Sequence, residues 1–359
     1  MQLENEKVIL SENKKLIHNR ELEEFELPSD ECIIEVKYAG VCSSDVARSH
    51  FSGAYFYPLV MGHEFSGTVL KVGKDVDEFN IGDNVAVFPL LPCFTCSSCL
   101  IEEYAKCQDY KYYGSRNDGG FCKYISVKSW NLLISDDRDQ KKTALMEPLC
   151  VAINTLKIAN LWEESDSKKR VLLIGAGFIG SLIAEMLKIK NPSIYLEVVD
   201  RNDYKLEKFS ENISKKTFLE NSEDWNHFLE KSDKFEVIIE ATGYPPFFNN
   251  SIELAQANAH LIWMSNIQSD LLIPKKKVSM LLRKELKVSG VWNSRYKNKE
   301  SDDWNDALEI LGNDEIDILK FVSHEISLNE LPTYLKGLAD YKENGRPFRC
   351  SKVLVDLKR

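Results

Sequence analysis

The chain has 359 residues, 43% of them hydrophobic, and its 46 Lys and Arg residues against 56 Asp and Glu residues give a formal net charge of −10. The length suggests two domains of about 100–200 residues each, and the negative charge argues against DNA or RNA as a partner. No apolar run approaches the about 18–20 residues that cross a bilayer, and the first thirty residues contain no signal-peptide core. We therefore expect a cytoplasmic protein without a membrane partner, in which the nine cysteines serve metal binding or catalysis rather than disulfides.

The first third of the chain is expected to form short β-strands. Residues 34–38 alternate between apolar and charged side chains, which is the two-residue period of a half-buried strand. Residues 65–72 and 84–88 are further candidates because turn residues bound them.

From residue 169 onward the chain alternates between strands and helices. The expected strands cover residues 170–174, 194–199, 235–240 and 260–264, with a first helix over 178–188. A helix over 302–311 and a strand over 352–357 are expected near the end. This pattern predicts an α/β protein with a β-rich first part, up to about residue 150, followed by a parallel sheet with right-handed crossovers.

Four cysteines occur close together in the β-rich part. Cys93, Cys96, Cys99 and Cys107 have the spacing C-x2-C-x2-C-x7-C. Four thiolates suit a closed tetrahedral zinc site that stabilises a lobe and leaves no position for chemistry. Four free cysteines or an iron–sulfur cluster remain as alternatives.

Three other short segments contain the ligands of an open zinc site. They are residues 40–45 with Cys42, residues 62–64 with His63, and residues 146–148 with Glu147. A thiolate, an imidazole and a carboxylate leave zinc a fourth position for water or substrate, where the metal polarises an alcohol or carbonyl oxygen. A lone cysteine or glutamate is usually structural, and His63 alone is explained equally well as an ordinary turn histidine. The prediction therefore depends on the occurrence of the three segments together with the four-cysteine cluster.

A glycine motif follows the strand expected at 170–174. The run Gly175-Ala176-Gly177-Phe178-Ile179-Gly180 permits a tight turn and brings backbone N–H groups to a pyrophosphate at a helix N-terminus. Asp200 ends the next strand, where a carboxylate binds the adenosine ribose and repels a 2′-phosphate. This favours NAD over NADP, although the neighbouring Arg201 weakens the preference.

The order of these motifs resembles the zinc-dependent medium-chain dehydrogenase/reductase superfamily over essentially the whole chain. The resemblance implies a GroES-like catalytic domain of residues 1–150, completed by 295–359, an inserted Rossmann domain of residues 151–294, and an active site in the cleft between them. The pair Glu147-Pro148 resembles the polyol branch, in which a glutamate replaces a cysteine as zinc ligand. Segments 89–96, 113–121 and 281–292 resemble a member of that branch that acts on a sugar-alcohol phosphate.

The resemblance also implies roles for individual residues. Cys42, His63 and Glu147 would bind the catalytic zinc, and Glu64 would enter the zinc shell during exchange of water and substrate. Ser44 would relay the substrate proton, and Asp45 would buttress the site. The implied cofactor contacts are Gly175, Gly177, Phe178, Ile179, Gly180, Asp200, Arg201, Lys205 and Thr242.

Two positions depart from the family pattern. Ala47 stands where many members have the histidine that completes the proton relay, and Ser43 stands where glycine is usual. His50 is either a substitute for that histidine or an ordinary surface residue, so the route of the proton to solvent stays open.

The expected reaction is hydride transfer between a sugar-alcohol phosphate and its ketose phosphate with NAD(H), or with NADP(H), in a homodimer or homotetramer that holds two zinc ions per chain. Arg116 is the best candidate for binding the substrate phosphate, since a loop arginine makes bidentate contacts to phosphate, but a structural salt bridge explains it equally well. Arg346 and Lys352 are weaker candidates. An unphosphorylated polyol or secondary alcohol as substrate, or a zinc-stabilised binding protein without turnover, are the alternatives.

Overall fold

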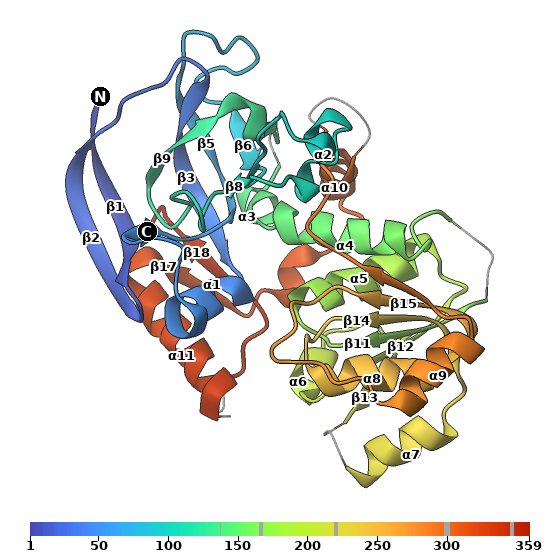
Figure 1. Ribbon diagram of the computed structural model, residues 1–359. Coiled ribbons are helices and arrows are strands. Elements are labelled where there is room, and N and C mark those ends of the chain that lie inside the picture. The colour runs from blue at the N-terminus through green and yellow to red at the C-terminus, as the bar shows by residue number, and fades with distance from the viewer. Residues whose placement is uncertain (137, 165–167, 219–221, 298–301, 345–347) are drawn as a thin grey trace. The chain divides into compact units, whose positions relative to one another are not determined.

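The computed structural model describes residues 1–136, 138–164, 168–218, 222–297, 302–344 and 348–359 (Figure 1). The described chain divides into two compact units, Met1–Pro148 with Arg295–Arg359 and Leu149–Ser294. Among the described helices, none combines the length and the apolar character that crossing a membrane would require.

The first unit is built on a seven-stranded sheet with the order β10-β6-β5-β3-β18-β17, in which β9 also pairs with β3. The strands are β3 (Glu31–Val41), β5 (Glu64–Val72), β6 (Asn84–Val87), β9 (Tyr124–Lys128), β10 (Leu132–Ile134), β17 (His324–Ser327) and β18 (Val353–Asp356). In β3, Ile34, Val36 and Tyr38 are buried while Glu35 and Lys37 are half-exposed, as the alternation predicts. Because β18 pairs with β3, the last residues of the chain complete a sheet that begins near its start (Figure 1).

Smaller elements surround this sheet. A three-stranded sheet has the order β2-β1-β4, and β7 pairs with β8. These strands are β1 (Gln2–Glu12), β2 (Lys15–Glu24), β4 (Leu59–Val60), β7 (Leu90–Leu91) and β8 (Lys111–Tyr112). The helices and single turns are α1 (Ser43–Ala47), η1 (Arg48–Ser52), α2 (Ser97–Leu100), η2 (Tyr104–Lys106), η3 (Ser129–Asn131), α3 (Gln140–Ala144), α10 (Asp303–Gly312), η4 (Ile318–Phe321), η5 (Leu328–Glu330) and α11 (Leu331–Asn344).

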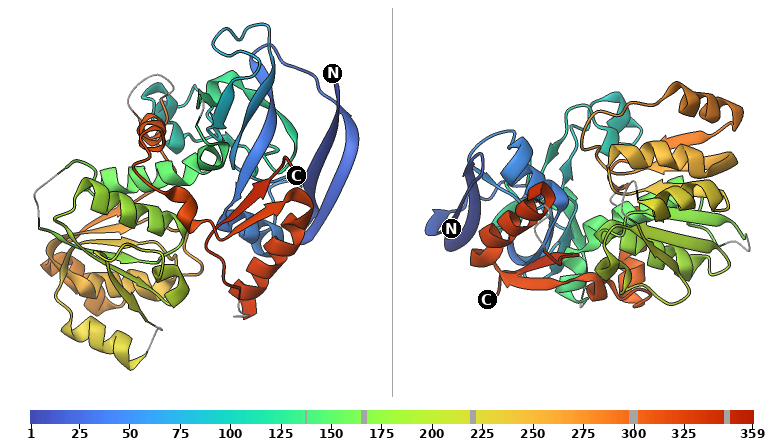
Figure 2. Two further views of the ribbon diagram at one scale, coloured as in Figure 1. Left: turned by 180° about the vertical axis from the view of Figure 1, so that it is seen from behind. Right: turned by 90° about the horizontal axis from the view of Figure 1, so that it is seen from below.

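The second unit is a six-stranded parallel sheet with the order β13-β12-β11-β14-β15-β16. Its strands are β11 (Arg170–Ile174), β12 (Tyr195–Asp200), β13 (Ser214–Thr217), β14 (Phe235–Glu240), β15 (Ala255–Trp263) and β16 (Lys287–Gly290). Its helices are α5 (Phe178–Lys190), α6 (Asp203–Leu206), α7 (Glu223–Lys231), α8 (Pro245–Leu254) and α9 (Lys275–Arg283), after α4 (Met146–Ile158), which continues from the first unit. The strand order runs in opposite directions from β11, so right-handed crossovers place α5 and α8 on opposite faces (Figures 1 and 2).

The predicted α/β class, with a GroES-like β-rich part and a Rossmann-like parallel sheet, is confirmed. The expected strand at 260–264 begins earlier, at Ala255, because the polar Gln256 and Asn258 give no strand signal. The N-terminal hairpin of β1 and β2 and the helix α11 were not predicted.

Candidate active site

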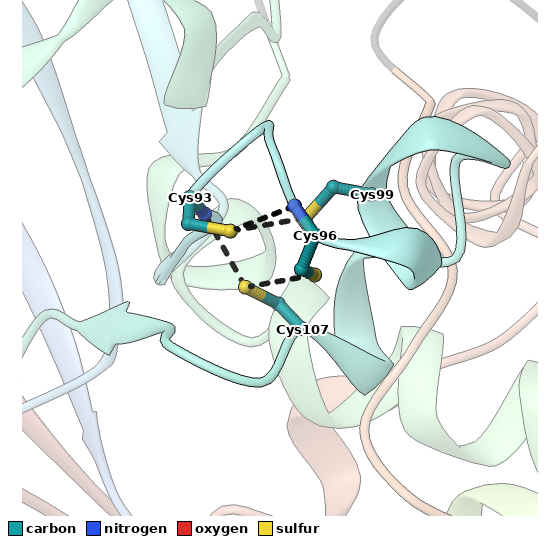
Figure 3. Close-up of side chains that lie close together, drawn as sticks. All are labelled: Cys93, Cys96, Cys99 and Cys107. Carbon is teal, nitrogen blue, oxygen red and sulfur yellow. Dashed lines mark hydrogen bonds between the residues drawn. The ribbon is translucent and has the colours of Figure 1, made fainter.

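The four clustered cysteines lie on the turns around α2 and η2 in the first unit. Their sulfur atoms all lie within 4.8 Å of one another, and Figure 3 shows the side chains turned toward a common centre. Hydrogen bonds from the Thr95 hydroxyl and from backbone N–H groups lower the pKa of the Cys93 thiol to about 6, whereas burial raises the pKa of the Cys99 and Cys107 thiols. The lobe packs on Trp130 through the rings of Phe94, at 5.0 Å, and Tyr104, at 5.2 Å.

The spacing of the sulfur atoms distinguishes zinc from an iron–sulfur cluster. Cys93 and Cys99 have sulfurs 3.9 Å apart, as do Cys96 and Cys107. A tetrahedral zinc with bonds of about 2.3 Å places its sulfurs about 3.8 Å apart, whereas a cluster holds cysteines on different irons and spreads them further. The cluster therefore fits one zinc ion with all four positions filled by protein.

A second group of metal-ligating side chains forms where the end of one strand meets the start of its neighbour. Cys42 follows β3 and precedes α1, His63 directly precedes β5, and Glu64 begins β5, which pairs with β3. The ligand atoms of Cys42, His63 and Glu64 lie within 4.8 Å of one another. His63 and Glu64 are buried and Cys42 is half-buried, so this is a sheltered site with mixed nitrogen, sulfur and oxygen donors.

The electrostatics of this pocket favour a cation. Asp45 is fully buried in α1, accepts a hydrogen bond from the Cys42 backbone N–H at 2.9 Å, and lies 3.6 Å from His63 Nδ1. Burial works against a charged imidazole, but Asp45 and Cys42 outweigh it and raise the pKa of His63 well above its usual value. Groups that stabilise positive charge on the imidazole also suit a zinc ion, and Asp45 holds the imidazole as outer-shell carboxylates do.

Glu147 lies in the first turn of α4 and is not one of the three grouped ligands. Its Oε1 accepts a hydrogen bond of 3.2 Å from Tyr112 Oη, in β8, and the Tyr112 ring centroid lies 5.8 Å from that of His63. Burial raises the pKa of the Glu147 carboxyl to about 7. The pocket therefore offers two carboxylates beside Cys42 and His63. Tyr112 had no signal in the sequence, because a lone tyrosine in a two-residue strand belongs to no motif.

The residues near the proton relay lie on α1 and η1. Ser44 is half-buried in the first turn of α1, two residues after Cys42. Ala47 ends this helix and has no group that can carry a proton. His50 is half-buried, with Nδ1 2.8 Å from the Oγ of the buried Ser49, whose hydroxyl donates to the Asp45 carbonyl at 2.7 Å.

The glycine motif has the geometry of a nucleotide-binding turn. Gly175 follows β11 with φ of +108°, a conformation that favours glycine, and Gly177 caps α5. A Cβ at Gly180 would lie 2.2 Å from the carbonyl oxygen of Gly175, so the helix approaches the turn closely only because residue 180 is glycine. At Gly177 a Cβ would meet nothing within 4 Å, which leaves open space beside the N-terminus of α5. Phe178 is buried and Ile179 is half-buried in the first turn.

Asp200 lies at the carboxyl end of β12, next to this turn. Its Oδ2 accepts from the Ala176 N–H at 2.7 Å, its Oδ1 accepts from the Asn202 N–H at 2.9 Å, and Lys205 Nζ is 3.8 Å away. The exposed Arg201 follows directly. The structure thus brings Asp200 to the glycine turn.

Thr242 lies just beyond β14, on the other side of the glycine turn. Its backbone N–H donates to the buried Glu240 carboxylate at 2.9 Å, and its methyl group would lie 2.8 Å from a Cβ at Gly175. Gly175 and Thr242 are therefore immediate neighbours at the carboxyl edge of the sheet.

Arg116 lies in the turn after β8, and its guanidinium is held between two aromatic rings. The guanidinium carbon is 4.1 Å from the ring centroid of Tyr55 and 4.3 Å from that of Tyr110. Among the described residues no ion pair joins Arg116 to a carboxylate, and its contacts there are with the two aromatic rings. Arg346 lies outside the described residues, and Lys352 is buried beside Glu64.

Comparisons with known proteins agree with this fold. A family profile described as alcohol dehydrogenase GroES-like domain matches residues 28–137, and one described as shikimate/quinate 5-dehydrogenase matches residues 157–285. The chain belongs to the zinc-dependent medium-chain dehydrogenases/reductases, in the polyol dehydrogenase group, and is an oxidoreductase.

Two relatives and one solved structure show which members of that family this chain is similar to. The chain is 32% identical to galactitol 1-phosphate 5-dehydrogenase of Escherichia coli K12, over 91% of this chain and 92% of the relative. It is 30% identical to D-altritol 5-dehydrogenase of Agrobacterium fabrum, over 89% and 92%. The crystal structure of galactitol-1-phosphate dehydrogenase from Escherichia coli superposes with a TM-score of 0.85 at 29% identity, over 98% of this chain and 99% of the other.

Proposed function

We propose that the protein interconverts a sugar-alcohol phosphate and its ketose phosphate by hydride transfer with NAD(H). Residues 1–150 with 295–359 form the catalytic domain, and residues 151–294 bind the nucleotide. The assignment of a phosphorylated substrate depends on the guanidinium of Arg116. This group lies against the rings of Tyr55 and Tyr110 and has no acidic partner among the described residues. The similarity to galactitol 1-phosphate 5-dehydrogenase supports this proposal.

The stacking of Arg116 suits a phosphate for a geometric reason. Rings that lie over the guanidinium carbon leave the N–H edges of the guanidinium for bidentate hydrogen bonds in its plane. The Arg116 backbone N–H donates to the Tyr112 carbonyl at 2.9 Å, and the Tyr112 hydroxyl donates to Glu147 at 3.2 Å. The anion site and the metal pocket therefore share Tyr112, which fits a substrate with a phosphate at one end and the reacting carbon at the other.

In the catalytic pocket, Cys42, His63 and Glu147 would hold the metal, with Glu64 as a second carboxylate in reach. A bound zinc ion would supply a Lewis acid that lowers the pKa of a substrate hydroxyl or polarises a ketone. Ser44 would relay the substrate proton: its hydroxyl oxygen accepts that proton as its own hydrogen passes to a water molecule, and the two transfers run in the opposite sense in reduction. Asp45 orients His63. With the four-cysteine cluster, this gives two zinc ions per chain.

Residues at the carboxyl edge of the second unit's sheet determine which nucleotide is bound. Gly175, Gly177 and Gly180 leave room for the pyrophosphate, and Thr242 faces the nicotinamide side. Asp200 places a negative charge where NADP carries its 2′-phosphate, so NAD(H) is preferred. Lys205, whose Nζ lies 3.8 Å from Asp200, binds the adenosine ribose with it. Arg201, the next residue in the chain, moderates the preference.

The test is an assay of NADH oxidation with a panel of ketose phosphates and the corresponding free ketoses. We expect turnover with a phosphorylated ketose, and Arg116→Ala should lower kcat/KM for that substrate by about 10–100-fold, since hydrogen bonds to a charged group contribute about 1.5–3 kcal/mol. Arg283→Ala, which removes an exposed arginine from α9, is the matched control and should leave kcat/KM unchanged.

Turnover of free ketoses alone would contradict the phosphate assignment. It would favour the second candidate function, oxidation of an unphosphorylated polyol, which the similarity to D-altritol 5-dehydrogenase supports.

A further inference from the structure

A buried carboxylate lies in the second unit where the strand order changes direction. Glu240 is the last residue of β14 and is paired with Ile174 of β11 on one side and with Trp263 of β15 on the other. It is fully buried, and among the described residues no cation pairs with it. A charge buried without an ionic partner costs stability, and this one lies at the edge where open α/β sheets bind their ligands. The groups that Glu240 holds therefore indicate its use.

The Glu240 carboxylate holds the turn of residues 242–244. The Thr242 backbone N–H, at 2.9 Å, and the Thr242 hydroxyl both donate to Oε1, and the Gly243 N–H donates to Oε2 at 3.1 Å. The Thr242 hydroxyl also accepts from the Tyr244 N–H at 3.0 Å. The single proton of this hydroxyl is therefore committed to Glu240 and is not offered to a ligand.

The segment after β15 holds the same turn. The backbone N–H of Gln268 donates to the Gly243 carbonyl at 2.9 Å, and its side-chain amide donates to the Thr242 carbonyl at 3.0 Å. The backbone N–H and C=O groups of Thr242 and Gly243 are thus all paired within the protein. What this turn contributes to a ligand site is consequently its position and shape, more than free hydrogen-bonding groups.

The position of the turn matters because it lies against the glycine motif. The Ala241 N–H donates to the Ile174 carbonyl at 2.9 Å, and the Thr242 methyl group would lie 2.8 Å from a Cβ at Gly175. A turn released from Glu240 would move this methyl group relative to Gly175. The space beside the glycine motif would change with it.

We propose that Glu240 is a positioning residue for the nucleotide, whose carboxylate fixes the turn of residues 242–244 against the glycine motif. The inference rests on the proposed function, in which this sheet edge binds NAD(H). In this role the Thr242 hydroxyl is the link to Glu240 and not a contact to the cofactor. A glutamine at position 240 has one acceptor oxygen and an NH₂ group that would face a donor, so it cannot hold both parts of the turn.

The experiment measures the Kd of NADH for the zinc-loaded protein without substrate, together with the Tm and amide hydrogen exchange in the turn. We expect Glu240→Gln to raise the Kd about tenfold and to speed exchange, because hydrogen bonds to a charged acceptor are lost. The Tm should stay within about 2–4 °C of the wild-type value, since a buried charge is removed along with its hydrogen bonds. The kcat at saturating NADH should be unchanged, as expected when binding alone is weakened. Glu197→Gln, at a buried carboxylate in β12 of the same sheet, is the matched control and should keep the wild-type Kd.

A second variant tests the link between Glu240 and the turn. Thr242→Val keeps the shape of the side chain and removes the hydroxyl, so it should also raise the Kd of NADH. Combined with Glu240→Gln it should add little, because both substitutions break the same contact. Where Glu240→Gln does not fold, Thr242→Val carries the test alone, since the carboxylate then keeps its two N–H donors.

A wild-type Kd of NADH in folded Glu240→Gln or in Thr242→Val would overturn the inference, whether or not the Tm falls. Additive effects in the double variant would overturn it as well, because Thr242 would then act on the nucleotide independently of Glu240. Wild-type protein that binds neither NADH nor NADPH would instead overturn the proposed function.

Discussion

The four-cysteine cluster takes its ligands from residues 93–107, whereas the pocket around Cys42 draws its groups from strand ends and helix starts between residues 42 and 352. The cluster is made by tight turns and needs little from the rest of the unit. The pocket exists only because β5, β3 and β18 are neighbours in one sheet. All four positions of the cluster are filled by sulfur, while the pocket offers nitrogen, sulfur and oxygen donors of differing availability. A closed centre suits stability and an open one suits chemistry.

The largest effect should come from removing a ligand of the open pocket. Cys42→Ala should lower kcat/KM by about 1000-fold or more, because Lewis-acid stabilisation is worth several kcal/mol. Its Tm should change by no more than about 2–4 °C, the shift for 1 kcal/mol in a domain of this size. Cys32→Ala, at a buried cysteine in β3 away from both centres, is the matched control and should retain activity. A Cys42→Ala variant with wild-type turnover would refute the role of the pocket.

Removing a ligand of the closed cluster should have the opposite profile. Cys99→Ser replaces a buried ligand and should cost about 3 kcal/mol or more, which lowers the Tm by about 10 °C. The molecules that remain folded should keep the wild-type turnover per active site, with the number of active sites counted by titration with NADH. A stable Cys99→Ser protein without activity would contradict the division of roles between the two centres.

Asp45→Asn keeps the size of the side chain but removes the charge facing His63. We expect the affinity of the pocket for zinc to fall by about 10–100-fold, as for other outer-shell carboxylates, while the cluster keeps its zinc. Competition with a chromophoric chelator measures both. Equal weakening of the two centres would mean that Asp45 supports the whole unit and not the pocket alone.

The smallest effect is expected at Tyr112. Tyr112→Phe removes the hydrogen bond to Glu147 and keeps the ring beside His63, so kcat/KM should fall by at most about tenfold. Zinc content should stay at the wild-type value. A loss as large as that of Cys42→Ala would show that the phenol takes part in the chemistry itself.

The same contrast explains what the sequence could predict. Cys93 to Cys107 and the run from Gly175 to Gly180 are local patterns, and both form single clusters in the structure. The strands at 170–174 and 235–240 were predicted with their bounds, because buried parallel strands are continuous apolar runs.

Contacts between residues that are far apart in the chain were harder to predict from the sequence. Nothing near Lys352 in the sequence indicates that it reaches Glu64, since the contact depends on which strands are neighbours and on their register. Tyr112 and the stacking of Arg116 between Tyr55 and Tyr110 depend in the same way on turns that carry no motif. The sequence indicated Cys42, His63, Glu64 and Glu147, but the structure was needed to show that Glu64 is grouped with Cys42 and His63 while Glu147 pairs with Tyr112.

The most direct test of the two-centre account is a chelator titration of the wild-type protein in which zinc release, turnover and the folded fraction are followed together. We predict that turnover disappears with the zinc of the open pocket while the protein stays folded, and that unfolding accompanies the zinc of the four-cysteine cluster. Turnover that persists until the cluster zinc is released, or a single release step that abolishes turnover and fold together, would contradict the account.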